Sequence, residues 1–129
     1  MQSIRDIMRT EPISVSPATP VTEVLRLLID NHISGVPVVQ ADKSIVGVLT
    51  EMDLLSLFWE DGVSVAADLM TKNPRSFSVD EPVVDVVDCL MANNFRRVLI
   101  HEDGKLVGLI SRADLMPAIL REVRARHPS

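Results

Sequence analysis

The sequence predicts an α/β fold of the α+β type, made of two pseudo-symmetric units that each contain a short sheet flanked by two helices. Three observations predict this fold. The chain has 129 residues, which is the length of one compact module. Apolar residues make up 47% and charged residues 24%, as in soluble globular proteins. The second half of the chain also repeats the pattern of the first.

The repeat appears when the sequence is compared with itself at a fixed offset. An offset of 62 residues aligns identical residues in unbroken order, namely Asp6 with Asp68, Met8 with Met70, Pro12 with Pro74, Ser14 with Ser76, Pro20 with Pro82, Val24 with Val86, Leu28 with Leu90 and Val36 with Val98. One residue fewer near Ala41 changes the offset to 61, which aligns Val46 with Val107, Gly47 with Gly108, Asp53 with Asp114 and Leu54 with Leu115. The copies run from about 4 to 58 and from about 66 to 120. We therefore divide the chain into a first unit, 1–60, and a second unit, 61–129.

Each copy begins with an extended segment and continues into an amphipathic helix. Apolar residues recur at helical spacing behind a proline, which is favoured in the first turn of a helix. In the first copy these residues are Val21, Val24, Leu25 and Leu28 behind Pro20, and in the second they are Val83, Val86, Val87 and Leu90 behind Pro82. The pattern predicts one helix in each copy.

A hairpin and a second helix follow in each copy. The apolar, β-branched runs 36–39 and 45–49 predict the strands of the first hairpin, and 98–101 and 106–110 predict those of the second. The second helix begins at Thr50 in the first copy and at Ser111 in the second, where it extends to about Arg126. A unit of this size buries too little apolar surface alone, so we expect the copies to pack sheet against sheet and to form two equivalent clefts.

Charge and cysteine content narrow the function classes. The net charge of −5 argues against nucleic acid or an anionic membrane as a partner. The single cysteine, Cys89, has no partner for an internal disulfide, and three dispersed histidines lack the spacing of metal ligands. We expect no metal, no required cofactor, no membrane span and a reducing, cytoplasmic location. Without a nucleophile–base pair or a phosphate loop, we do not expect an enzyme.

The strongest local motif is a hydroxyl residue three positions before an aspartate at a predicted strand-to-helix turn. It occurs as Thr50 with Asp53 behind Gly47, and as Ser111 with Asp114 behind Gly108. In one interpretation the glycine lets a ligand approach the backbone, and the aspartate accepts the hydroxyls of a ribose. In the other, the motif is a helix cap that resembles a capping box. The two interpretations are compatible.

These motifs together resemble a pair of CBS (cystathionine-β-synthase-type) domains. The resemblance rests on Asp6-Ile-Met with Pro12, on Ile33-Ser-Gly-Val-Pro-Val-Val39 and on Val46-Gly-Val-Leu-Thr-Glu-Met-Asp-Leu-Leu55, and it covers nearly the whole chain. It implies a disc-like pair, called a Bateman module, whose two clefts bind adenosine-containing ligands such as AMP, ADP, ATP or S-adenosylmethionine. It also implies association of the discs through their helices, hence a homodimer.

The resemblance also assigns ligand residues. Asp53 and Asp114 would hold the ribose, with Thr50 and Ser111 beside the ribose or phosphate. Each cleft would combine the aspartate of one copy with the N-terminal strand of the other, which places Ile13 and Ser14 at Asp114 and places Arg75 and Ser76 at Asp53. Phosphate-binding cations would be Arg96, Arg97 and Arg112, which favour the Asp114 cleft for a phosphorylated ligand. Leu99 stands where the first copy has Pro37, which departs from the family's pattern.

The expected function is a regulatory, ligand-sensing module that passes the occupancy of its clefts to a partner protein. The alternative is a structural dimerisation or interaction module with empty clefts, which would explain the apolar stripes equally well. Ligand binding separates the two functions. Exposed aromatic residues at Phe58 and Trp59 would indicate self-association.

Overall fold

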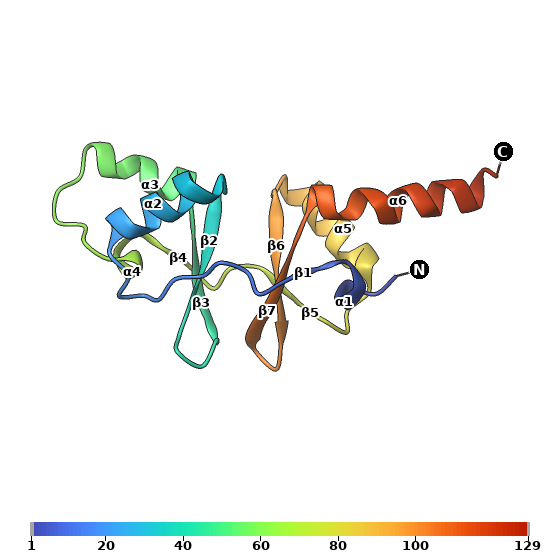
Figure 1. The fold of residues 1–129 in the computed structure, drawn as a ribbon, viewed down its shortest axis with the longest axis horizontal. Coiled ribbons are helices and arrows are strands. Elements are labelled where there is room, and N and C mark those ends of the chain that lie inside the picture. Colours follow the sequence, from blue (N-terminus) through green and yellow to red (C-terminus); the bar gives the residue numbers. More distant parts are fainter. Residues whose placement is uncertain (1, 129) are drawn as a thin grey trace. The chain divides into compact units, whose positions relative to one another are not determined.

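The computed structural model describes residues 2–128, which form two compact units. The Asp53 unit contains Ile13–Pro74 and Gly104–Leu106. The Asp114 unit contains the residues up to Pro12, Arg75–Asp103 and the residues from Val107 onward. Both units combine a small sheet with helices, which confirms the predicted fold class (Figure 1).

The Asp53 unit contains a three-stranded sheet in the order β2-β3-β4. Strand β2 pairs antiparallel with β3, which forms the first predicted hairpin. The elements of this unit are α2 (Val21–Asn31), β2 (Gly35–Val39), β3 (Ile45–Thr50), α3 (Glu51–Leu55), the 3₁₀ turn η1 (Ser56–Phe58), α4 (Ala66–Leu69) and β4 (Thr71–Lys72).

The Asp114 unit contains a four-stranded sheet in the order β1-β7-β6-β5. Strand β5 runs parallel to β6, whereas β1 is antiparallel to β7. The elements are α1 (Ile4–Ile7), β1 (Arg9–Thr10), β5 (Ser76–Ser78), α5 (Val83–Asn93), β6 (Arg97–Glu102), β7 (Lys105–Ser111) and α6 (Arg112–Arg126). The first two residues of β7 group with the Asp53 unit.

The N-terminal segments of the two sequence copies are exchanged between the sheets. Strand β1 comes from the first copy but pairs with β7 of the second, with Arg9 opposite Leu109. Strand β4 comes from the second copy but pairs with β3 of the first, with Lys72 opposite Gly47. The expected division into 1–60 and 61–129 therefore marks the copies of the repeat, whereas the compact units are divided differently because each sheet takes its edge strand from the other copy.

Two glycines permit this exchange. A Cβ atom added at Gly108 would lie 2.8 Å from the carbonyl oxygen of Arg9 and 2.7 Å from the sulfur of Met8. A Cβ atom added at Gly47 would lie 2.9 Å from the carbonyl oxygen of Thr71. Such distances are shorter than van der Waals contact, so only glycine fits at these positions. The structure gives these glycines a packing role against the exchanged edge strand, and the interpretation that they let a ligand approach the backbone stays a prediction.

The paired long helices begin and end at equivalent residues. Helices α2 and α5 start directly after Pro20 and Pro82, as predicted from the proline position. They are followed by the C-cap residues His32 and Asn94, which adopt left-handed backbone conformations with φ of 53° and 54°. At these residues the backbone changes direction and leads into the hairpin strand that follows each helix.

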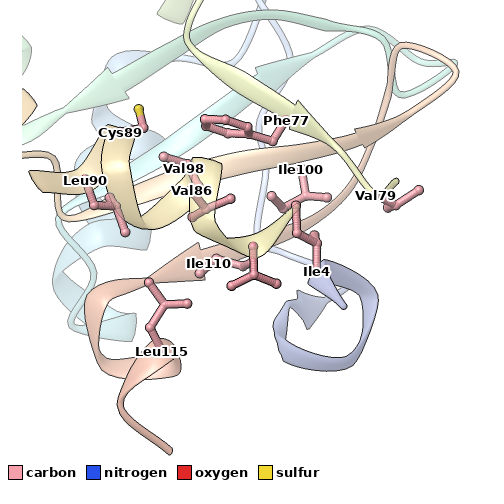
Figure 2. Packing of buried hydrophobic residues seen from close by; sticks show 11 residues of the cluster. Ile4, Phe77, Val79, Val86, Cys89, Leu90, Val98, Ile100, Ile110 and Leu115 are labelled. Carbon is pink, nitrogen blue, oxygen red and sulfur yellow. The ribbon is translucent and has the colours of Figure 1, made fainter. Parts of the chain in front are cut away.

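Each unit has its own apolar core between helices and sheet. In the Asp114 unit, Figure 2 shows Val86 of α5 and Ile100 of β6 side by side, with Ile110 of β7 and Ile4 of α1 close to them. In the Asp53 unit the corresponding cluster includes Val24, Val38 and Leu49. Cys89 forms no disulfide and is buried in the core of the Asp114 unit, as its place on the apolar side of the helix predicts.

The second helices differ in length. Helix α6 continues to Arg126, as predicted, whereas its counterpart α3 ends at Leu55 and passes into η1. The short helices α1 and α4 lie in segments expected to be only extended. An aspartate at the third position caps the first turn of each helix: Asp6 accepts a hydrogen bond from the Ser3 backbone, and Asp68 accepts one from the Val65 backbone. Among residues 2–128, no helix is long and apolar enough to cross a membrane.

Candidate functional site

Asp114 is fixed at the turn between β7 and α6 by a reciprocal helix cap. The backbone N–H of Ser111 donates to Oδ2 of Asp114 at 2.9 Å, and the backbone N–H of Asp114 donates to the Ser111 hydroxyl at 3.2 Å. These two bonds form a capping box, so the cap interpretation of the motif is confirmed here. The cap uses one carboxylate oxygen and fixes the direction of the other.

The second oxygen of Asp114 accepts a charged donor from the exchanged segment. Nε of Arg9 donates to Oδ1 of Asp114 at 2.8 Å. The Asp114 side chain is 9% exposed, whereas the Arg9 side chain is 77% exposed. The ion pair therefore has a nearly buried carboxylate and a guanidinium that remains largely in solvent.

The pKa of Asp114 reflects this environment. Burial by itself raises the pKa of the carboxyl group, but the hydrogen bonds from Arg9 and Ser111 and the charge of Arg9 outweigh it. The net effect is a pKa below the usual range for aspartate, and the pKa of Arg9 is raised by the same hydrogen bond and charge. Asp114 is therefore an anion at neutral pH.

Asp53 occupies the equivalent turn between β3 and α3. The backbone N–H of Thr50 donates to Oδ2 of Asp53 at 2.9 Å, and the Thr50 hydroxyl donates to the same oxygen at 3.2 Å. The hydroxyl of Thr71 lies 3.4 Å from Oδ1, at the limit of hydrogen bonding. Thr71 is the residue that the offset of 62 aligns with Arg9. Asp53 and Asp114 thus each take part in a helix cap of the same kind, but the partner of Oδ1 differs between them.

Arg9 and Thr71 were not predicted as site residues. The repeat offset aligns them, and both follow an aligned methionine. What the sequence does not contain is the pairing of β1 with β7, which brings Arg9 to an aspartate 105 residues away. A long-range strand pairing of this kind leaves no periodic signal in the sequence.

The three predicted cations lie in the Asp114 unit. Arg112 is the first residue of α6, and its backbone N–H donates to the carbonyl oxygen of Arg96 at 3.1 Å. Arg97 opens β6 and is half-buried, whereas Arg96 and Arg112 are exposed. The equivalent bond in the Asp53 unit joins the backbone N–H of Glu51 to the carbonyl oxygen of Ser34 at 3.0 Å. The two turns therefore share this backbone hydrogen bond, whereas their side chains differ in charge: Arg112 is aligned with Glu51, and Arg96 with Ser34.

The remaining predicted residues are distributed between the units. Ile13 and Ser14 lie in the Asp53 unit, and Arg75 and Ser76 lie in the Asp114 unit. The Arg75 guanidinium stacks 4.8 Å from the ring centre of Phe77, and the Ser76 hydroxyl lies 3.0 Å from Nδ1 of His101. The expected pairing of Ile13 and Ser14 with Asp114, and of Arg75 and Ser76 with Asp53, stays a prediction.

The Asp114 unit also contains a pocket of about 500 Å³ between β5 and α5. Arg75, Phe77 and Cys89 are part of its lining, and neither Asp114 nor Arg9 borders it. In the part of the chain that the structure describes, no group of three or more His, Cys, Asp or Glu side chains is placed to hold a metal ion.

The family model for the CBS domain matches the chain twice, over residues 4–60 and 65–121. Among curated proteins, the chain is 30% identical over 142 residues to the chloroplastic CBS domain-containing protein CBSX1 of Arabidopsis thaliana. That alignment covers 86% of this chain and 60% of CBSX1, so the chain spans less than two thirds of this relative.

Solved structures show the same fold. The crystal structure of CBSX2 in complex with AMP matches with a TM-score of 0.86 at 29% identity, covering 96% of this chain and all of that chain. The CBS domain pair of protein MJ0100, crystallised with 5'-methylthioadenosine and S-adenosyl-L-methionine, matches with a TM-score of 0.80 at 23% identity, covering 95% of this chain and 98% of that chain. Both matches extend over nearly the entire chain and include both units.

Proposed function

Because the chain belongs to the CBS domain family, we propose that it is a regulatory module that binds an adenosine-containing ligand through Asp114 and Asp53. The observation that carries the proposal is the pair of capped carboxylates, each fixed at a strand-to-helix turn with one oxygen committed to the turn. The complex of CBSX2 with AMP supports the ligand class. Candidate ligands are AMP, ADP, ATP and S-adenosylmethionine.

The chemistry of the turn suits a ribose. A carboxylate has about four acceptor positions, and the backbone bond to Oδ2 leaves acceptor capacity for the two hydroxyls of a ribose. Hydrogen bonds between a hydroxyl and an ionised carboxylate are about twice as strong as neutral ones. The lowered pKa of Asp114 keeps this carboxylate ionised, so it accepts and does not donate.

The module acts by binding and not by catalysis in this proposal. Occupancy of the sites would be passed to a regulated partner protein, in a reducing compartment such as the cytoplasm that keeps the Cys89 thiol unpaired. No required cofactor and no nucleic-acid or membrane partner form part of the proposal. The side chains proposed to contact the ligand donate and accept hydrogen bonds, which suits reversible binding.

A structural dimerisation module is the second candidate function. Exposed apolar side chains favour it, because isolated monomers rarely leave so many on neighbouring turns in solvent. The exposed apolar residues on α3, η1 and the following turn are Met52, Leu55, Phe58 and Trp59, and those on α6 are Met116, Ile119, Leu120 and Val123. Self-association and ligand sensing are compatible, and a homodimer is part of the proposal.

A thermal-shift screen with AMP, ADP, ATP and S-adenosylmethionine tests the proposed function. A ligand that binds only the folded protein at a hundredfold excess over Kd raises the free energy of unfolding by about 2.7 kcal/mol. We expect a clear rise in Tm with at least one compound. The double variant Asp53→Asn, Asp114→Asn is the control, since its amides can still cap the helices but lack the charge. No shift with any compound, confirmed by calorimetry, would favour the structural module.

A further inference from the structure

The two equivalent turns differ in charge. Each position around Asp114 that carries an arginine is aligned with an uncharged or acidic residue around Asp53. The aligned pairs are Arg9 with Thr71, Arg96 with Ser34, Arg97 with Gly35 and Arg112 with Glu51. A repeat whose backbone hydrogen bonds coincide has therefore diverged in charge at the same four places.

Arg9 bonds directly to the Asp114 carboxylate. Its Nε–H donates to Oδ1 of Asp114 at 2.8 Å, which uses one of the five N–H groups of the guanidinium. The Asp114 carboxylate therefore holds Arg9 at Nε, while 77% of the Arg9 side chain is exposed. The remaining N–H groups are thus kept beside Asp114 and directed to solvent.

We propose that Arg9 makes the Asp114 site selective for phosphorylated adenosine compounds, and that the Asp53 site, with Thr71 in the same position, takes unphosphorylated ones. This inference rests on the proposed function, because it assumes that both carboxylates bind ribose. It adds a specificity residue that comes from the exchanged N-terminal segment.

The selectivity follows from two opposing effects of Arg9 on a ligand: it competes with the ribose for Asp114, and it attracts a phosphate. A ribose hydroxyl at Oδ1 of Asp114 must share that oxygen with Arg9, which weakens the binding of any nucleoside. A phosphate compensates, because an arginine already held in place loses little conformational freedom when it forms charge-assisted bonds to phosphate oxygens.

The Asp53 site presents the reverse situation. The Thr71 hydroxyl lies 3.4 Å from Oδ1 of Asp53, so competition for this oxygen is weak. Glu51 begins the adjoining helix and would repel a phosphate. An unphosphorylated nucleoside therefore has the better balance of interactions at this turn.

The test isolates each site and compares AMP with adenosine by isothermal titration calorimetry. Asp53→Asn isolates the Asp114 site, and Asp114→Asn isolates the Asp53 site. We expect the Asp114 site to prefer AMP and the Asp53 site to prefer adenosine. Arg9→Thr should lower the AMP-to-adenosine affinity ratio at the Asp114 site by about tenfold or more, since a charge-assisted bond is lost.

Reciprocal and matched variants complete the design. Thr71→Arg should raise the AMP-to-adenosine ratio at the Asp53 site, which tests the inference by gain of preference even if Arg9→Thr fails to fold. Arg5→Thr is the control, because Arg5 lies in the same segment and forms an exposed ion pair of 2.7 Å with Glu102. It should leave the ratio unchanged.

The outcomes separate the inference from the proposed function. If the wild-type protein binds neither AMP nor adenosine, the proposed function is wrong and the inference fails with it. If both bind and neither Arg9→Thr nor Thr71→Arg changes the ratio by more than about twofold, well under 1 kcal/mol, only the inference is wrong. A change in ratio for Arg5→Thr of the same size as for Arg9→Thr would also overturn it.

Discussion

At Asp114 one carboxylate accepts hydrogen bonds from a helix cap and from Arg9 at the same time. The sequence motif predicted the cap and a ligand role as compatible interpretations, and the structure shows the cap together with an ion pair that neither interpretation contained. In the proposed function, stability and ligand affinity both depend on this side chain. Substitution by asparagine, which keeps the planar shape of the side chain but removes its charge, separates the two.

Asp114→Asn should affect affinity more than stability. The asparagine side chain can still accept the bond from the Ser111 backbone, but it no longer pairs with the charge of Arg9, whose guanidinium lies largely in solvent, so we expect a loss of about 1–2 kcal/mol in the free energy of unfolding. Affinity for the adenosine ligand at this site should fall about tenfold or more. Titration calorimetry and urea unfolding measure the two effects, with Asp53→Asn as the matched variant. Wild-type affinity with reduced stability would make Asp114 a cap alone.

The stabilisation by the Asp114 charge should depend on pH. Because the folded-state pKa of Asp114 is lowered, this contribution is present above the unfolded-state pKa of about 3.9 and is lost as pH falls through the lower folded-state value. The difference in unfolding free energy between wild type and Asp114→Asn should therefore be largest near neutral pH and shrink below about pH 4. Urea unfolding at a series of pH values measures it. A difference that grows on acidification would contradict the assignment.

At the scale of elements, the exchanged edge strands are the feature that organises the site. Strand β1 is only two residues long, yet it places Arg9 opposite Leu109 and beside Asp114. A two-residue strand has little pairing energy of its own, so its position depends on the close approach to Gly108.

Gly108→Ala should displace β1 and destabilise the Asp114 unit. The new methyl group would lie 2.8 Å from the Arg9 carbonyl oxygen, and overpacking of this kind costs about 1–3 kcal/mol. Urea unfolding and hydrogen exchange at β1 measure the effect. Adding Met8→Ala should not restore stability, because the backbone oxygen remains in place. Full rescue by Met8→Ala would show that the conflict is with the Met8 side chain.

At the scale of the whole molecule, large apolar side chains are exposed to solvent, which is unfavourable for an isolated monomer. Phe58 and Trp59 are 82% and 84% exposed and contact each other edge to face. A homodimer, as the family resemblance implies, would bury them.

Replacing Phe58 and Trp59 by serine should shift the protein from dimer to monomer. Each aromatic side chain buries about 150–250 Å² in an interface, so the pair supplies several kcal/mol of association energy. Light scattering over a range of concentrations measures the mass. Met91→Ser, at an equally exposed residue of α5, is the control. A monomer mass for the wild-type protein at every concentration would remove the prediction.

The sequence predicted what is local and repeated. The offsets of 62 and 61 identified both hairpins, both long helices and both capped aspartates, because periodicity and caps depend on neighbouring residues. Strand β5 was expected only as an extended segment, since three residues carry no readable period. The partner of Asp114 was missed because Arg9 reaches it through a pairing between distant segments, which depends on tertiary structure.

The exchange of edge strands has a consequence for the order in which the chain can fold during synthesis. When the ribosome has completed residues 13–74, all three strands of the Asp53 unit exist, and its sheet can form. Strand β1 is synthesised before these residues, but it must wait for β7 before it has a sheet to join. A gene cut between the two copies of the repeat would yield a first half that lacks β4 and whose β1 has no β7 to pair with.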